Sequence, residues 1–310
     1  MRILLWHVHG SWTTALVQGG HHYLVPVLPD RGPDGRGRAQ TWDWPASVEE
    51  VTPAAARSAD IDCVVLQRPS ELEHLAERWT GRRPGRDVAA VYVEHNAPDG
   101  PVAAMRHPAA ERGDVTVAHV THFNARFWDC GRAPTAVIEH GVVDPGHLYS
   151  GEIAAAAMVV NEPVRRGRVV GTDLLAGFRR QVPVDLFGMA SEELGGHDLP
   201  QWRLHREMAR RRVYLHPFRW TSLGLSLIEA MHLGMPVVAL ATTEVPEAVP
   251  ADAGVVSNRL DVLHAALRRL VADPDEARAR GERARRAALG RFSLARFLAD
   301  WDALLKEVTA

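Results

Sequence analysis

The loop Thr221–Gly224 and the carboxylate of Glu229 lie in a stretch whose pattern suits the binding of a phosphate at its loop. Apolar side chains recur at helical spacing from Leu225 to Leu233, so the loop opens a helix that follows a short buried strand. The first backbone N–H groups of a helix have no partner within it and lie at its positive dipole end, so they can hold a phosphate. Glu229 follows just over one turn later, in an apolar helix where an ionised carboxylate needs a partner. A solvated glutamate on an amphipathic helix is the alternative interpretation.

Histidines follow two of the strands expected in the first half of the chain. His7 and His9 come after the strand expected at 3–6, and His95 comes after the strand expected at 88–93. An H-x-H pair at a strand end places both imidazoles on one face, which suits a metal ion. The sequence has no further compact cluster of His and Asp to complete such a site. Side chains that line a cleft with ordinary hydrogen bonds are therefore the alternative to a metal-dependent hydrolase.

These groups must be positioned by two domains of alternating strands and helices, because apolar runs of strand length alternate with helically spaced segments. The segment 29–45 is rich in Gly, Pro, Arg and Asp and is expected to be a long exposed loop. Its Trp42 and Trp44 either stack on a sugar or an apolar acceptor, or pack the loop onto the domain. The expected strands cover 3–6, 23–28, 61–67, 88–93, 115–120, 135–139, 155–160, 184–187, 213–215, 237–240 and 254–256. The expected helices cover 13–17 (after a loop at 7–12), 69–79, a segment from 121, 199–212, 225–233, 260–272, 274–289 and 292–307.

Length and composition limit the class of protein. A chain of 310 residues indicates about two domains. Its 36 basic and 38 acidic residues nearly balance, which gives no reason to expect a nucleic-acid partner. Lys306 is the only lysine, so a side-chain cation that contacts phosphate must be arginine. The two cysteines lie far apart and the chain shows no signal peptide, which predicts a cytoplasmic protein. No apolar run is long enough for a transmembrane segment, although peripheral membrane contact stays open.

Four short motifs together resemble the C-terminal nucleotide-binding segment of family-4 retaining glycosyltransferases of the GT-B fold. They are Leu223-Gly224-Leu225-Ser226, Glu229-Ala230-Met231, Gly234-Met235-Pro236-Val237-Val238 and Pro246-Glu247-Ala248-Val249. The resemblance implies an α/β protein with two Rossmann-like domains whose parallel sheets face each other across a cleft. It implies an N-terminal, acceptor-side domain at 1–146, a nucleotide-sugar-binding domain at 147–290, and a C-terminal helix at 291–310 that crosses back to the N-terminal domain.

The resemblance also implies roles for residues of the second domain. Glu229 would bind the ribose of the donor nucleotide, while Thr221 takes the position where the family has a glutamate beside the donor sugar. Val170 takes the position of a family lysine that grips the diphosphate, so the charge must come from Arg165, Arg166 or Arg168. The remaining residues implied here are the diphosphate loop Ser222, Leu223 and Gly224, and Gly188, whose turn would lie close to the nucleotide base. A solvated basic loop is the alternative for the three arginines.

In the first domain the resemblance assigns His95 to the donor sugar and the reaction centre. Gly10 and Ser11 are the nearest equivalents of a loop close to the donor diphosphate and the acceptor. The alternative for His95 is a histidine that ends a strand and has no catalytic role.

The resemblance implies a retaining, metal-independent glycosyltransferase of the hexosyltransferase type, without a cofactor. Its donor would be a nucleotide sugar, and its acceptor is unknown. Thr221 and Val170 replace a glutamate and a lysine of the family pattern. These two differences keep a second hypothesis open, a catalytically weak or inactive GT-B protein that binds a nucleotide sugar or glycan. The metal-dependent hydrolase with His7 and His9 is the third. The sequence leaves open the nucleotide, the sugar, the acceptor and the oligomeric state.

Overall fold

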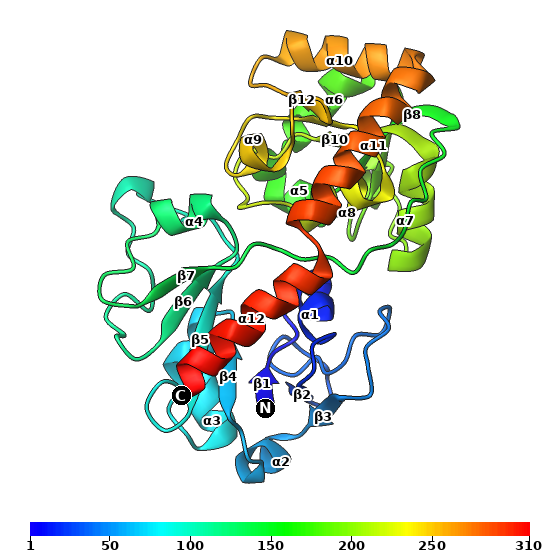
Figure 1. The fold of residues 1–310 in the computed structure, drawn as a ribbon. Coiled ribbons are helices and arrows are strands. Elements are labelled where there is room, and N and C mark those ends of the chain that lie inside the picture. The colour runs from blue at the N-terminus through cyan, green and yellow to red at the C-terminus, as the bar shows by residue number, and fades with distance from the viewer. The chain divides into compact units, whose positions relative to one another are not determined.

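The structure, a computed structural model, describes residues 1–310 and divides into two compact units. Unit 1 comprises Met1–Val143 and Leu294–Ala310, and unit 2 comprises Asp144–Ser293. Each unit contains one β-sheet in which every paired strand is parallel, with helices packed on it (Figure 1). The prediction of two Rossmann-like domains with parallel sheets is confirmed.

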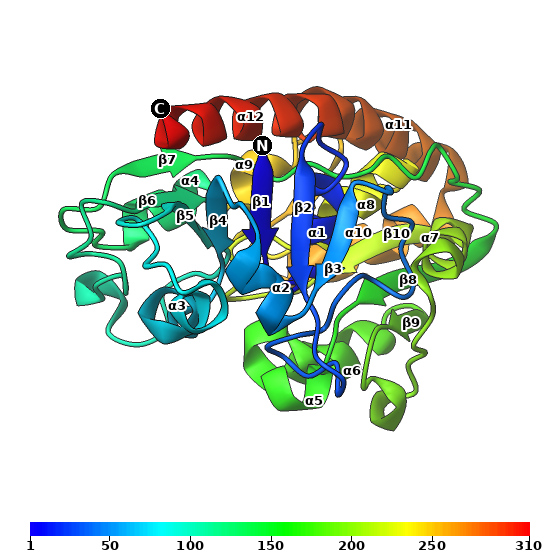
Figure 2. The same ribbon diagram turned by 90° about the horizontal axis from the view of Figure 1, so that it is seen from below.

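Unit 1 is built on a seven-stranded sheet with the order β3-β2-β1-β4-β5-β6-β7. The first strand pairs with two neighbours, and Ile3 lies between Tyr23 and Cys63 in the register (Figure 2). The strands are β1 (Arg2–Leu5), β2 (His22–Pro26), β3 (Val48–Val51), β4 (Cys63–Leu66), β5 (Ala89–Glu94), β6 (Thr116–His119) and β7 (Thr135–Val137). Because all are parallel, their carboxyl ends meet at one edge of the sheet, where ligands of such sheets bind.

The last helix of the chain belongs to unit 1, where it contacts α1 and β5. Its Phe297 and Trp301 both meet the indole of Trp12 edge-on, with ring centroids 6.3 and 5.6 Å away. The C-terminal helix therefore returns to the N-terminal domain, as the sequence predicts. The helices of unit 1 are α1 (Gly10–Leu16), α2 (Pro53–Ser58), α3 (Ala76–Thr80), which continues a π-helical turn Glu71–Leu75, α4 (His122–Phe127) and α12 (Leu294–Thr309).

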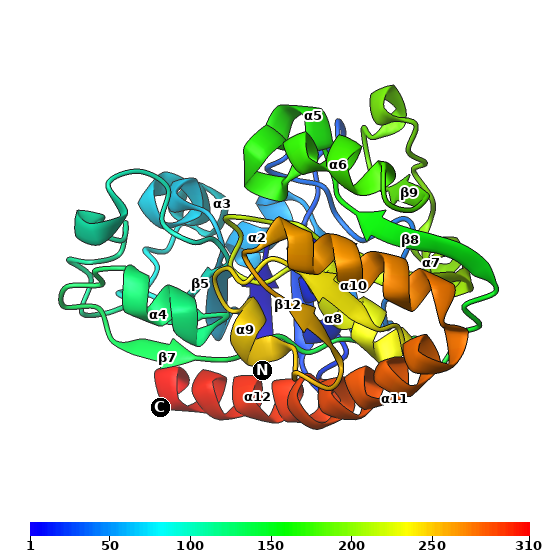
Figure 3. The ribbon, with the colours of Figure 1, turned by 90° about the horizontal axis from the view of Figure 1, so that it is seen from above.

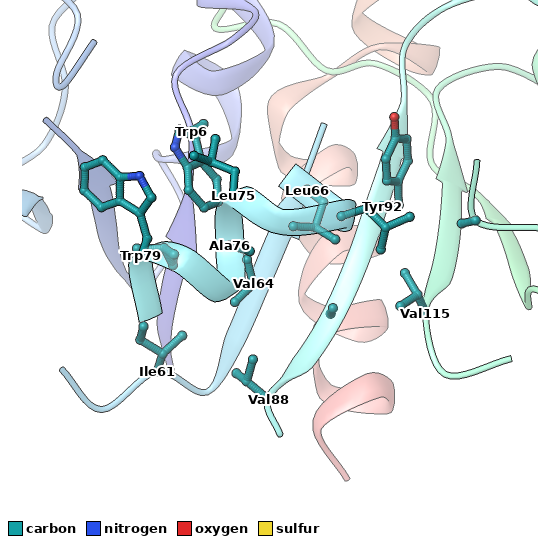
Figure 4. Packing of buried hydrophobic residues seen from close by; sticks show 14 of the residues in the cluster. Trp6, Ile61, Val64, Leu66, Leu75, Ala76, Trp79, Val88, Tyr92 and Val115 are labelled. Atoms are coloured by element: carbon teal, nitrogen blue, oxygen red, sulfur yellow. The ribbon is translucent and has the colours of Figure 1, made fainter. Parts of the chain in front are cut away.

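Alternate residues along each strand of unit 1 pack on opposite faces of the sheet. Leu4 and Val64 face the side of α2 and α3, where Trp6 and Trp79 meet edge-on at 6.3 Å (Figure 4). This face holds a continuous apolar core that keeps the strand ends, and the loops after them, in place.

Unit 2 is built on a five-stranded parallel sheet with the order β12-β11-β10-β8-β9. Helix α10 contacts β8, β10, β11 and β12 on one face of this sheet (Figure 3). The strands are β8 (Ile153–Val159), β9 (Val184–Phe187), β10 (Arg211–His216), β11 (Val237–Ala239) and β12 (Gly254–Val256). The helices are α5 (Pro163–Arg166), α6 (Leu175–Arg179), α7 (Gln201–Arg210), α8 (Leu225–Leu233), α9 (Val245–Ala248), α10 (Leu260–Ala272) and α11 (Pro274–Arg291). No helix in the chain has the length and apolar character needed to cross a bilayer.

One strand and the course of one loop differ from expectation. The sequence analysis did not anticipate β3, because its Val-Glu-Glu-Val sequence is charged at its centre and pairs only at the edge of the sheet. The segment 29–45 is an irregular loop whose residues are mostly exposed or half-buried, as expected, but it is also tied to the domain. The guanidinium of Arg38 donates to the carbonyls of Trp44, Pro45 and Val48, and Trp44 is only 4% exposed.

Alanine substitutions at two glycines of α11 are expected to change the stability of the protein in opposite directions. A Cβ atom on Gly281 would lie 1.9 Å from the carbonyl oxygen of Gly234, which ends α8, whereas a Cβ on the exposed Gly290 would meet nothing within 4 Å. Gly281→Ala is therefore expected to lower the free energy of unfolding by about 1–3 kcal/mol through overpacking. Gly290→Ala is expected to raise it by about 0.5–1 kcal/mol through helix propensity. Urea unfolding of both variants checks this, and equal effects would contradict the packing.

Candidate active site

The N-terminus of α8 is presented at the carboxyl end of β10, one of the inner strands of unit 2. Gly224 caps the helix in an extended conformation and provides no side chain for the first turn. The helix has nine residues, so its dipole is well developed, and Ser222 and Leu223 just before it are buried. This local geometry is what the sequence predicts for a phosphate-binding loop.

Gly224 also lies against the ring of His216, the last residue of β10. A Cβ atom on Gly224 would lie 2.6 Å from Cε1 of His216, and 3.3 and 3.6 Å from its two ring nitrogens. The edge of the imidazole that carries both nitrogens therefore faces the start of the helix. Any side chain at Gly224 would clash with that edge, so glycine is required for the approach.

His216 is wholly buried in a stack of aromatic rings. It lies between Tyr214 and Phe218, with ring centroids 6.0 and 4.1 Å away and interplanar angles of 27° and 30°. Neither ring nitrogen has a hydrogen-bond partner. Burial, aided by the nearby cation of Arg166, lowers the pKa of His216 from 6.5 to about 3, so the imidazole is neutral.

The three arginines after β8 differ in whether a carboxylate neutralises them. Arg165 makes two hydrogen bonds to Glu162, at 2.9 and 2.5 Å, and Arg168 is 3.1 Å from the carboxylate of Asp173. The backbone N–H of Arg166 donates to the carbonyl of Glu162, but its guanidinium makes no hydrogen bond or ion pair, and the guanidinium carbon lies 5.9 Å from the centre of the Phe218 ring. It is half-buried, and burial followed by the repulsion of Arg165 lowers its pKa. Among the three, Arg166 is the cation left to bind an anion.

The turn after Arg168 brings this arginine segment against the loop that follows β10. Gly171 has a φ of +74°, and a Cβ there would lie 2.1 Å from the carbonyl oxygen of Pro217. Arg219 strengthens the contact with two hydrogen bonds to Asp173, at 2.6 and 2.9 Å. Val170 is fully buried in the core, so the position aligned with the family lysine carries no phosphate ligand.

Glu229 is buried in α8, receives a hydrogen bond from Gln201 of α7 and lies next to His205 of the same helix. Its Oε2 lies 3.0 Å from the amide nitrogen of Gln201 and 3.3 Å from Nε2 of His205. The carboxylate is 3% exposed, so the solvated-glutamate alternative does not hold. The two oxygens of a carboxylate can accept several hydrogen bonds, including those of hydroxyl groups.

The two other sequence candidates of unit 2 lie at neighbouring loops. Thr221 is half-buried in the loop before α8. Gly188 follows β9 with a φ of +126°, and a Cβ there would lie 2.2 Å from the carbonyl oxygen of Val160. The glycine therefore lets the turn after β9 pack tightly on the end of β8, with Met189 exposed beside it.

In unit 1, His95 is held at the carboxyl end of β5 by Gln67. The amide nitrogen of Gln67 donates to the carbonyl of Trp6 at 2.7 Å, so its oxygen faces Nε2 of His95 at 3.0 Å. Nε2 therefore carries the proton, because an amide oxygen only accepts. Burial, followed by the repulsion of His9 and His140, holds the pKa of His95 well below 6.5. The imidazole is neutral, with a defined tautomer.

Three histidines gather around this position. The ring centroids of His9 and His95 are 4.1 Å apart, and Trp12 meets His95 edge-on at 4.9 Å. His140 follows β7 and is buried, and its Nδ1 lacks a hydrogen-bond partner. Ser11 and Gly10 open α1 immediately after His9, and the indole nitrogen of Trp42 lies 3.5 Å from where a Cβ of Gly10 would be.

The hypothesis of a metal site at His7 and His9 does not fit these contacts. Nδ1 of His7 bonds to the carbonyl of Gly37 at 3.1 Å, and its ring packs against Trp44, while the His9 ring packs against His95. The two rings thus engage different partners. The chain contains no group of three or more His, Cys, Asp or Glu side chains arranged to hold a metal ion. The indole nitrogen of Trp44 donates to Thr14 at 2.8 Å, so Trp44 packs the loop onto the domain.

The buried neutral histidines predict how stability depends on pH. Burial lowers the pKa of both His140 and His216 to about 3. Below pH 6.5 the unfolded chain binds protons at these residues while the folded protein does not, so stability falls as the pH decreases. Each residue contributes up to about 1.4 kcal/mol per pH unit. Urea unfolding at pH 7.5 and 5.5 should show this loss, and His140→Phe should reduce it. Equal stability at both pH values would contradict the prediction.

Sequence reasoning missed five side chains that the structure brings to these sites. Gln67 and His140 join His95, while Gln201 and His205 join Glu229. His216 joins Gly224. His140 and His216 could have been found from the sequence, because each lies at or just after the end of a strand, on the side where parallel sheets bind ligands. The helical residues Gln201 and His205 have no such signal.

Comparisons with known proteins agree with this geometry. Residues 197–287 match the family described as glycosyl transferases group 1, and this segment contains α7, α8 and Glu229. No curated protein gives a significant match.

Solved structures of similar fold extend over the whole chain. Sucrose-phosphate synthase from Thermosynechococcus elongatus superposes with a TM-score of 0.73 at 15% identity, over 99% of each chain. Anabaena HepE, in complex with UDP-glucose, superposes with a TM-score of 0.69 at 17% identity, over 99% of this chain and 100% of its own. TarM from S. aureus, in a complex that includes UDP, has a TM-score of 0.61 at 14% identity, over 78% of this chain and 55% of its own. Residues 197–287 thus match a group 1 glycosyltransferase segment, and the chain has the GT-B fold.

Proposed function

We propose that the protein is a retaining, metal-independent hexosyltransferase that uses a nucleoside diphosphate sugar, with UDP the first candidate for the nucleotide. The observation that carries this proposal is the arrangement in unit 2 of an uncapped helix N-terminus, an arginine without a carboxylate partner and a buried glutamate. The UDP complexes of HepE and TarM support the choice of nucleotide, because these proteins share the fold.

The diphosphate binds at the start of α8. Its oxygens accept hydrogen bonds from the backbone N–H groups of Ser222, Leu223 and Gly224, at the positive end of the helix dipole. Arg166 supplies a full positive charge. When the bond to the sugar breaks, negative charge grows on the leaving phosphate, and cations and backbone dipoles that are already in place stabilise it. A guanidinium can do this without a metal ion, through two parallel hydrogen bonds.

The ribose binds to the carboxylate of Glu229. A buried, ionised acceptor makes strong hydrogen bonds to hydroxyl groups, and Gln201 and His205 hold its Oε2 in place. The turn after β9 at Gly188 contacts the base. Thr221 lies near the sugar, where a hydroxyl in place of a carboxylate alters recognition of the donor sugar relative to the family.

The histidines of unit 1 act on the sugar and the acceptor. His95 is neutral and has a fixed tautomer, so it offers directed hydrogen bonds without adding charge. Gly10 and Ser11 belong to the same acceptor-side surface. In a retaining reaction on one face of the sugar, the leaving phosphate takes the proton of the acceptor hydroxyl, so no protein nucleophile is required.

One observation favours a second candidate, a GT-B protein that binds a nucleotide sugar or glycan with little or no catalysis. Val170 is buried in the core, and Thr221 lacks a charge, so two charged groups of the family site have no counterpart at their own positions. This candidate predicts nucleotide binding without turnover.

Proton NMR of the purified protein with UDP-, GDP- and TDP-hexoses in EDTA, with and without a panel of sugar and lipid-linked acceptors, tests the proposal. We expect slow hydrolysis or transfer of one donor, with the anomeric configuration of the first-formed product equal to that of the donor. Inversion would reject the retaining mechanism, and activity that requires added metal would reject metal independence. Binding without any turnover would favour the second candidate.

A further inference from the structure

We propose that His216 is a ligand of the donor diphosphate, donating a hydrogen bond from a ring nitrogen to a phosphate oxygen. The inference rests on the proposed function and adds a residue that the four sequence motifs do not contain. It begins from an energetic problem. Buried polar atoms in folded proteins nearly always have a hydrogen-bond partner, yet both ring nitrogens of His216 lack one.

The surroundings of the ring limit where a partner can come from. Tyr214 and Phe218 cover its two faces, so a partner must approach in the plane of the ring. In that plane, the edge that carries both nitrogens faces Gly224 at the N-terminus of α8. The two unpartnered nitrogens of His216 therefore lie on either side of the ring atom that contacts Gly224, next to the start of the helix.

The charges around that place favour an anion. Arg166 is the nearest cation that affects the titration of His216, and it has no carboxylate partner of its own. The hydroxyl of Tyr214 donates to Ser226 on α8 at 2.8 Å, and it makes no hydrogen bond to His216. A neutral imidazole provides one N–H donor, so it can bind a phosphate oxygen without first taking up a proton.

Binding of three probes to wild-type protein and to His216→Phe tests the inference by calorimetry. Phenylalanine keeps a ring in the stack but removes both nitrogens. We expect the variant to bind UDP and inorganic pyrophosphate at least about tenfold more weakly, as for the loss of a hydrogen bond to a charged group, while its affinity for uridine stays within about twofold. The selective loss identifies a phosphate contact, because uridine carries the base and ribose alone.

Two further variants serve as controls. His264→Phe removes an imidazole from α10, where the ring lies edge-on to Phe178 at 5.2 Å, and is expected to leave all three affinities unchanged. His216→Gln restores a side-chain N–H donor and should recover part of the pyrophosphate affinity. It also keeps the test available if His216→Phe does not fold, as judged by thermal unfolding.

The outcomes separate this inference from the function on which it rests. Equal weakening of uridine and UDP in His216→Phe would make the histidine a purely structural residue and overturn the inference. Unchanged affinities for UDP and pyrophosphate would overturn it as well, while the donor site itself would stand. Failure of the wild-type protein to bind UDP, GDP, TDP or pyrophosphate would overturn the proposed function and this inference together.

Discussion

Replacing Arg166 with alanine is expected to lower kcat for donor turnover by roughly a hundredfold or more, the cost of removing one preorganised group that stabilises developing negative charge. The reason is that Arg166 is the one arginine among Arg165, Arg166 and Arg168 whose guanidinium makes no ion pair with a carboxylate. Its half-buried position strengthens its interaction with a phosphate relative to a cation in water. Steady-state kinetics with the donor sugar identified by the NMR screen measures the effect.

The neighbouring arginines provide matched controls. Arg165→Ala and Arg168→Ala remove the same charge a few residues away, but Arg165 pairs with Glu162, and Arg168 pairs with Asp173, which it shares with Arg219. We expect changes within about threefold for both, as is typical of exposed ion pairs. Arg166→Lys should recover part of the rate, because it restores the charge but not the planar fork. Equal losses for all three alanine variants would indicate a diffuse basic loop instead of a single phosphate ligand.

Replacing Glu229 with glutamine is expected to weaken UDP binding by roughly tenfold to a hundredfold, the range for lost hydrogen bonds to a charged group. Glutamine has the same shape but lacks the charge and one acceptor. Binding of inorganic pyrophosphate should not change, because pyrophosphate lacks the ribose. Calorimetry with both ligands measures the two effects, and the unchanged affinity for pyrophosphate distinguishes Glu229→Gln from His216→Phe.

A matched control for Glu229 lies on the surface of α11. Glu282→Gln makes the same chemical change at an exposed position and should leave both affinities unaltered. If Glu229→Gln weakens pyrophosphate as much as UDP, the carboxylate supports the fold of the loop instead of binding the ribose. Thermal unfolding of the variant then shows whether unit 2 is destabilised.

Strong local signals in the sequence predicted the elements that carry the donor site. Helix α8 was placed with its observed bounds, because Gly234 ends it in the left-handed conformation at φ +91° and Pro236 blocks its continuation. Glu229 was found as a candidate because a carboxylate in an apolar helix is unusual, and its burial follows from the same pattern.

The choice among the three arginines could not be made from the sequence. It depends on Glu162, whose left-handed backbone at φ +53° starts α5 and whose carboxylate binds Arg165, and on Asp173, which holds Arg168. These pairings arise from backbone bends over a few residues, which composition and periodicity do not encode. The sequence therefore predicted a basic segment near phosphate but left its ligand open.

Contacts between distant segments also could not be predicted from the sequence. The hydrogen bond between Gln67 and His95 joins residues from two strands, and the approach of Gly224 to His216 joins the two ends of a loop. Each contact depends on the packing of a whole unit. The edge strand β3 was missed for a different reason, because its charged centre lacks the apolar alternation that indicates a strand.

Calorimetric titration of the wild-type protein with UDP, GDP and TDP, in EDTA and again with magnesium, tests the central claim that unit 2 holds a nucleotide donor without a metal ion. We predict that one of the three nucleotides binds with clear preference, and with the same affinity in both buffers. Failure of all three nucleotides to bind in either buffer would contradict the claim.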